Sequence, residues 1–171
     1  FISWKVRDIK FLHNGADGAE NIGITGRGRL VSPDTDSELF TVAQDYLVTE
    51  DCVSLDDPVE KRICDGREGR PLLMPMFIAL ERCHGVLIEG LTLERSIFWN
   101  IVPQFCRNVT IRGITVRSHG HGRTDGIDIE STTDALIEYC SLDCGDDCYT
   151  FKSGRGEDGV RAAAPTARVV V

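Results

Sequence analysis

The sequence predicts an all-β chain folded as a parallel β-helix, a solenoid in which successive coils of short strands stack. Two observations support this prediction. An apolar pattern recurs along the chain, and the repeating region lacks the 3.6-residue period that would indicate helices. Units of this length cannot bury an apolar face alone, but they bury one when they stack. A β-sandwich with similar strand spacing is the alternative fold.

The recurring pattern places apolar residues at the first, third, sixth and eighth positions of each unit. Alternation within each pair predicts a strand, and the two-residue break between the pairs predicts a bend into a second strand. The clearest units begin at Val86, Val109 and Ala135, which lie 23 (109 − 86) and 26 (135 − 109) residues apart. A weaker earlier copy is expected at Ile22–Ile24, and the opening of a later copy at Val169–Val171.

The pattern disappears between residues 34 and 69, where we expect an insertion formed by a loop or a short helix. We expect residues 1–171 to be part of a single β-helix domain truncated at both ends. Phe1 is not an initiator Met, and no closing element follows the final valine run. Because each coil depends on its neighbours, the isolated chain is expected to be inactive and poorly stable.

Composition excludes several classes of function. The formal net charge is −8, and the basic residues are scattered among acids, whereas nucleic-acid binding needs a clustered basic face. No apolar run approaches the roughly 20 residues of a membrane span. We therefore expect neither nucleic acid nor a membrane as a partner, although a few local cations could still bind an anionic sugar.

Seven cysteines are present, and three of them, Cys140, Cys144 and Cys148, are spaced four residues apart. This spacing suggests a metal site, but structural zinc sites usually pair two short CxxC-type loops, and no second such pair occurs. Buried cysteines in stacked strands, or a disulfide in an exported protein, explain the count better. We expect these three cysteines to bind no metal, and Cys148 to pair, if at all, with a cysteine outside this chain.

Four carboxylates crowd a short region: Asp125, Asp128, Asp146 and Asp147. Asp125 precedes the last two by 21 (146 − 125) and 22 (147 − 125) residues, close to one coil, so they are expected to be neighbours on adjacent coils. Stacked carboxylates repel, which raises the pKa of one of them and can create a proton donor. Turn chemistry and calcium binding by Asp oxygens remain open alternatives to catalysis.

Two segments of this region together resemble the signature of family 28 glycoside hydrolases, the polygalacturonase family. They are Thr-Asp-Gly-Ile-Asp-Ile-Glu-Ser at 124–131 and Gly-Asp-Asp-Cys-Tyr-Thr-Phe-Lys-Ser-Gly at 145–154. The resemblance extends from about Arg70 to Gly159, and its further matches are Gly-Arg-Pro (69–71), Gly-Leu-Thr-Leu (90–93), Ser-Ile-Phe-Trp-Asn-Ile (96–101) and, more faintly, residues 21–30.

The resemblance implies a right-handed parallel β-helix that hydrolyses α-linked galacturonan with inversion, without a metal or an organic cofactor. It implies that Asp146 is the general acid, while Asp125 and Asp147 orient and deprotonate the attacking water. Inversion requires acid and base carboxyls about 6.5–9.5 Å apart, so that a water fits opposite the leaving group. Close neighbours are expected to hold the acid protonated at mildly acidic pH.

Three further residues are candidates for substrate binding. Arg123 stands where the family usually has Asn, which indicates either a cation for a substrate carboxylate or a different subfamily. Lys152 is suited to a uronate, to pairing with a catalytic Asp, or equally to a structural salt bridge. His121 lies upstream of Asp125, unlike the family's histidine, so we expect a loop histidine with possible substrate contact. Trp99, beside Phe98, is either a sugar-stacking platform or core packing.

The expected substrate is a pectic polysaccharide or an oligogalacturonide, and the expected protein is a monomer that is secreted or periplasmic. Three alternatives remain. A calcium-dependent pectate lyase uses a similar β-helix, the same hydrolytic residues could act on rhamnogalacturonan, and a solenoid of this kind could be a non-catalytic carbohydrate-binding protein.

Overall fold

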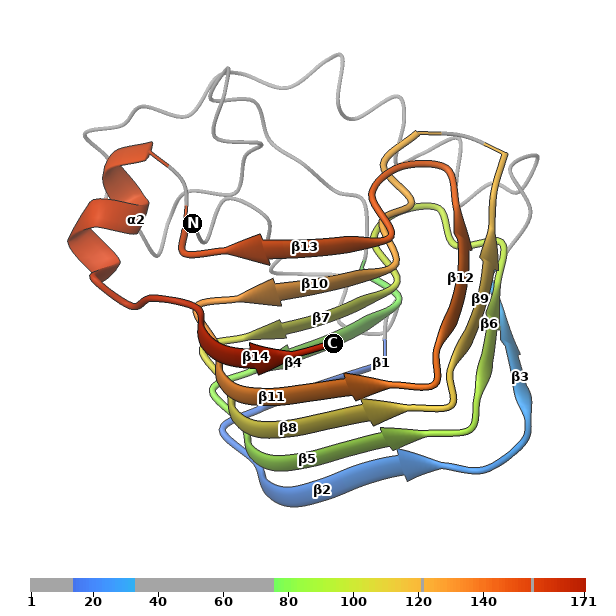
Figure 1. Cartoon of the computed structure of the whole chain (residues 1–171), viewed down its shortest axis with the longest axis horizontal. Helices are drawn as coiled ribbons and strands as arrows, with labels where there is room; N and C mark the ends of the chain where they lie inside the picture. The colour runs from blue at the N-terminus through green and yellow to red at the C-terminus, as the bar shows by residue number, and fades with distance from the viewer. Residues whose placement is uncertain (1–13, 33–75, 121, 155) are drawn as a thin grey trace.

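The computed structural model describes residues 14–32, 76–120, 122–154 and 156–171, so the predicted insertion at 34–69 lies outside the described residues. Successive coils stack, and their equivalent strands pair to form three parallel sheets (Figure 1). Sheet 1 contains β1 (Asn14–Asp17), β4 (Ile78–Glu81), β7 (Ile101–Gln104), β10 (Ile127–Glu130) and β13 (Tyr149–Lys152). Sheet 2 contains β2 (Glu20–Thr25), β5 (His84–Glu89), β8 (Arg107–Arg112), β11 (Thr133–Glu138) and β14 (Ala167–Val170). Sheet 3 contains β3 (Arg29–Val31), β6 (Thr92–Glu94), β9 (Thr115–Ser118) and β12 (Ser141–Cys144).

A short helix, α2 (Gly156–Ala162), lies between β13 and β14 and projects from the side of the stack (Figure 1). Every strand pair in the described residues is parallel, which confirms the predicted parallel β-helix and rules out the β-sandwich. No helix in this part of the chain is long and apolar enough to cross a membrane.

The predicted apolar pattern forms sheets 2 and 3. Val86, Val109 and Ala135 lie in register on neighbouring strands of sheet 2, and all three are buried. Ile22 pairs with Val86 and Val169 pairs with Ala135, so both weaker copies of the pattern are also confirmed. Stacking these positions buries one continuous apolar core, which a single coil could not do.

Sheet 1 was not predicted, because the sequence pattern indicated two strands in each coil and the structure has three. Strands β7 and β10 are buried along their whole length, so both of their faces are covered. In β7, which reads Ile-Val-Pro-Gln, apolar and polar residues do not alternate, so the two-residue period that identifies a strand is absent; β10 does alternate, but over only four residues. In β10 the polar face carries Asp128 and Glu130, while Ile127 and Ile129 enter the core.

The corner between sheets 1 and 2 is built from a stack of left-handed residues. Arg82, Phe105 and Ser131 occupy this corner in successive coils with φ values of 50°, 52° and 44°. Each backbone N–H donates to a carbonyl of the next coil, at 2.9, 3.0 and 2.8 Å respectively. Left-handed backbone is costly for residues other than glycine, and here the repeated inter-coil hydrogen bonds hold it in place.

The cysteines in the described residues range from buried, at Cys83 and Cys106, to exposed, at Cys148. Cys83 and Cys106 follow the same corner, and their Sγ atoms donate to the carbonyls two residues earlier, each at 3.3 Å. Burial raises the pKa of Cys106 to about 12, so its thiol stays neutral and packs as a small apolar group. All five cysteines in the described residues are free, and no three His, Cys, Asp or Glu side chains there could hold a metal ion. The pairing expected for Cys148 stays a prediction.

Candidate active site

The candidate site lies where sheet 1 begins, at the turns that lead into β10 and β13. The N–H of Gly126 donates to the carbonyl of Asp147 at 2.9 Å, and the N–H of Ile127 donates to the carbonyl of Cys148 at 3.0 Å. Asp125 and Asp147 therefore occupy equivalent positions on adjacent coils, as their spacing predicted. Asp146 and Asp147 lie in the turn between β12 and β13 and not in a strand, so side-chain alternation does not separate them.

Gly126 permits this close stacking of the two turns. A Cβ atom at position 126 would lie 2.5 Å from the carbonyl oxygen of Cys148 and 3.1 Å from Sγ of Cys144. The first distance involves backbone, which cannot move aside without breaking the inter-coil hydrogen bonds. The Thr-Asp-Gly sequence therefore contributes a carboxylate and, directly after it, the residue that lets the next coil approach.

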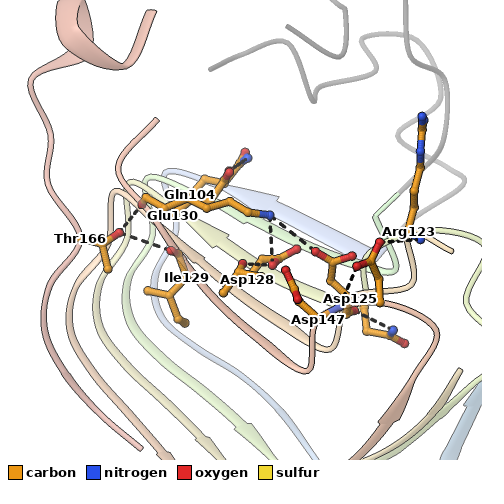
Figure 2. Close-up of polar contacts among 12 residues, drawn as sticks. Gln104, Arg123, Asp125, Asp128, Ile129, Glu130, Asp147 and Thr166 are labelled. Atoms are coloured by element: carbon orange, nitrogen blue, oxygen red, sulfur yellow. Dashed lines mark hydrogen bonds and ion pairs between the residues drawn. The ribbon is translucent and has the colours of Figure 1, made fainter. Parts of the chain in front are cut away.

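Two backbone amides orient the carboxylate of Asp146. Its Oδ2 accepts a hydrogen bond from the N–H of Arg123, and its Oδ1 accepts one from the N–H of Asp147, both at 3.1 Å. Asp146 is exposed, so the carboxyl is fixed in direction while it faces solvent. Arg123 reaches Asp146 through its main chain, with φ at 64°, and Figure 2 shows its side chain extending away from the acidic group.

Behind the turns, a partly buried ion-pair network connects β10 to β13. Nζ of Lys152 lies 3.2 Å from Oδ1 of Asp128 and 3.6 Å from Oδ2 of Asp125. Thr150 donates its hydroxyl to the same Oδ1 of Asp128. Asp128 is fully buried and Asp125 is 5% exposed, and Figure 2 shows both carboxylates gathered with that of Asp147.

The ammonium of Lys152 also rests on an aromatic side chain. Its Nζ lies 3.6 Å from the centroid of a Trp99 ring, and this ring stacks on Phe98 with centroids 4.8 Å apart. Both aromatic residues are buried and pack in a small cluster with Met76 and Val102. The structure thus places Trp99 in the core beneath Lys152, where its ring makes a cation–π contact with the ammonium.

The buried carboxyls are shifted toward their neutral forms. Burial, and then the charge of Asp128, raise the pKa of Asp125 above its usual range, while Lys152 opposes the rise. Burial also raises the pKa of Asp128, against the effects of Lys152 and the Thr150 hydroxyl. The expected repulsion between stacked carboxylates is present, since Asp146 adds to the rise at Asp125, but it is weaker than burial.

Glu130 extends this acidic group along β10. Its carboxylate accepts a hydrogen bond from the side-chain amide of Gln104, which lies opposite it on β7. Burial raises the pKa of Glu130 to about 7, while the bond from Gln104 and the charge of Lys152 oppose the rise. Sequence reasoning gave no role to Asp128 or Glu130, although their positions 22 residues before Thr150 and Lys152 place each pair side by side.

The structure therefore brings together Asp125, Asp146, Asp147 and Lys152 of the residues predicted from the sequence. Arg123 lies at the edge of this group with an exposed side chain, and its proposed contact with a substrate carboxylate stays a prediction. His121 lies outside the described residues, so its expected role is untested.

The fold and the site define a class of protein: a parallel β-helix with an acidic site. Its carboxylates cluster at the turns of two adjacent coils, just before β10 and β13 of sheet 1. Comparison with known proteins narrows the class. The profile described as "Glycosyl hydrolases family 28" matches residues 64–163, and the chain belongs to this family. The family inferred from the 124–131 and 145–154 segments is thereby confirmed.

Similar proteins include polygalacturonases from several plants. The chain is 39% identical over 98 residues to a probable polygalacturonase of Vitis vinifera. The matched residues make up 57% of this chain and 20% of that protein. It is 33% identical over 81 residues to a polygalacturonase of Juniperus ashei, covering 47% of this chain and 16% of the relative. The chain thus spans about a fifth or less of the length of these two relatives.

Solved structures agree on the fold. An exopolygalacturonase from Thermotoga maritima superposes with a TM-score of 0.74 at 34% identity, over 92% of this chain and 38% of that one. A family 28 exopolygalacturonase from Yersinia enterocolitica gives a TM-score of 0.57 at 17% identity over 82% of this chain and 28% of that one, which is a likeness of fold alone. These matches support the right-handed parallel β-helix expected from the sequence.

Proposed function

We propose that this chain carries the catalytic carboxylates of an enzyme that hydrolyses the α-glycosidic bonds of galacturonan with inversion. The observation that carries the proposal is the stacking of Asp125 against the Asp146–Asp147 turn of the next coil. Membership of glycosyl hydrolase family 28 supports the reaction type, and the polygalacturonases among the similar proteins support the substrate.

In this proposal Asp146 is the general acid that protonates the leaving-group oxygen. Its exposure supports the role, because a proton donor must reach a bond in a bound polysaccharide. The two amide donors fix the direction of the carboxyl without pairing it with a cation. A fixed donor loses little entropy on reaching the transition state.

Asp125 and Asp147 orient and deprotonate the attacking water. They occupy equivalent places on adjacent coils, so one water could contact both carboxylates. In a direct displacement the water attacks the anomeric carbon while the acid protonates the departing oxygen, and no covalent glycosyl-enzyme forms. For this step Asp125 must be ionised, although burial opposes its charge.

The test of this function is product formation from polygalacturonate by the full-length protein. We expect reducing ends to appear without a new ultraviolet absorbance, because hydrolysis adds water and creates no double bond. A metal chelator should leave the rate unchanged. An ultraviolet-absorbing product whose formation stops on addition of chelator would identify a calcium-dependent lyase, and no reaction on any pectic polymer would favour a non-catalytic solenoid.

A further inference from the structure

Lys152 occupies a central position that neither acid catalysis by Asp146 nor water activation explains. It lies on β13 in register with Glu130 of β10, and its ammonium contacts one oxygen of Asp125 and one oxygen of Asp128. The ring of Trp99 lies 3.6 Å below the same ammonium. The side chain is 28% exposed, and its ammonium contacts three protein groups.

Asp125 faces an excess of negative charge. The titratable groups around it include Asp128 and Glu130 of β10, Asp146, Asp147 and Cys148 of the turn, Cys144 at the end of β12, and Tyr149 and Lys152 of β13. Lys152 is the one cation that forms an ion pair with Asp125 or Asp128 in the described part of the chain. Charge on Asp125 therefore depends on this ammonium.

The hydrogen bonding of Asp125 and Asp128 also indicates that the charge of Asp125 depends on Lys152. Oδ1 of Asp125 and Oδ2 of Asp128 are buried and receive no hydrogen bond from the described residues. A buried carboxylate with few donors takes up a proton unless a cation compensates for its lost hydration. Thr150 donates to Asp128, whereas the side chain of Asp125 has the ammonium as its charged partner.

We propose that Lys152 is a positioning residue whose ammonium favours the ionised form of Asp125, so that Asp125 can accept the proton of the attacking water. Asp128 anchors the ammonium at 3.2 Å, and the Trp99 ring contacts it at 3.6 Å. The inference rests on the proposed hydrolytic function, and it assigns to Lys152 control of the base in place of contact with the uronate.

The test compares Lys152→Met with the wild type in the full-length protein, by the pH dependence of kcat/KM on polygalacturonate. Loss of the cation should raise the pKa of Asp125, and a base with a raised pKa is protonated over more of the acidic range. We expect the acidic limb of the profile to move up by one pH unit or more, so that activity below the limb falls about tenfold or more. Activity above the limb should fall much less.

Two further variants separate this role from a structural one. Lys152→Arg keeps a cation and should return the acidic limb toward the wild-type position. Arg117→Met removes a cation of β9 that pairs with Glu94 of β6, in sheet 3, and should leave the limb unchanged. Equal loss of kcat/KM at every pH in Lys152→Met, with the limb unmoved, would overturn the proposal.

A second measurement does not depend on activity. The carboxyl of Asp125 can be titrated by carbon-13 NMR in the wild type and in Lys152→Met, with Asp125→Asn used to assign its signal. A higher pKa in the Met variant supports the proposal, and an equal pKa refutes it. If the wild type does not hydrolyse galacturonan, the proposed function fails, yet this titration still decides whether Lys152 sets the charge of Asp125.

Discussion

Replacement of Asp146 by Asn is expected to lower kcat on polygalacturonate by at least about 100-fold, the usual scale for loss of a positioned proton donor. The asparagine oxygen can still accept one of the two backbone N–H bonds that orient residue 146, so the turn should survive. KM should change little, because the missing proton acts in the transition state and not in the bound ground state.

The matched control is Asp143→Asn. Asp143 is an acid of β12 in the same coil, and its side chain is 75% exposed, with His119, the residue that follows β9, 3.9 Å away. Removal of this charge should leave kcat close to that of the wild type. If Asp146→Asn were fully active, the Gly-Asp-Asp turn would be structural, and the relation to the family would be one of fold alone.

Replacement of Asp125 by Asn should reduce kcat to a similar extent, by about 100-fold, because the attacking water loses its base. Asp147→Asn should act in the same direction. The double variant Asp125→Asn with Asp146→Asn should lose far less than the product of the two single losses, because both groups serve one transition state.

Kinetics of the two single variants and the double variant on one substrate measure this coupling. Thermal unfolding of each variant controls for damage to the coil, which matters at Asp125 because its side chain is buried beside Lys152. Losses that multiply in the double variant would mean that Asp125 and Asp146 act in independent steps, contrary to the proposed mechanism.

The features predicted from the sequence are those that repeat. Val86, Val109 and Ala135 recur at nearly constant spacing, and stacking requires equivalent residues to face one core, so the period alone indicated a solenoid. The neighbourhood of Asp125 and Asp147 followed from the same period, because one coil takes about 22 residues in this region. The family resemblance supplied the roles, which spacing could not.

The features that were missed depend on burial and exact register. The polar face of β10 is covered, so Asp128 and Glu130 resemble exposed turn residues in the sequence although the structure buries them. Pairing of Lys152 with a catalytic Asp was one expectation from the sequence, but its contacts with Asp128 and Trp99 were not predicted, because they join β10, β13 and the segment before β7. A sequence pattern identifies which residues share a face, but the raised pKa of Asp125 comes from the depth at which it is buried.

The central claim is that a water activated by Asp125 and Asp147 attacks directly while Asp146 protonates the leaving group. The most direct test is proton NMR of the first product formed from polygalacturonate by the full-length protein, recorded before mutarotation equilibrates the anomers. Direct attack on the α-linkage predicts that the new reducing end appears first as the β-anomer, with inverted configuration. A product that appears first as the α-anomer would contradict the claim, since retention requires a covalent intermediate.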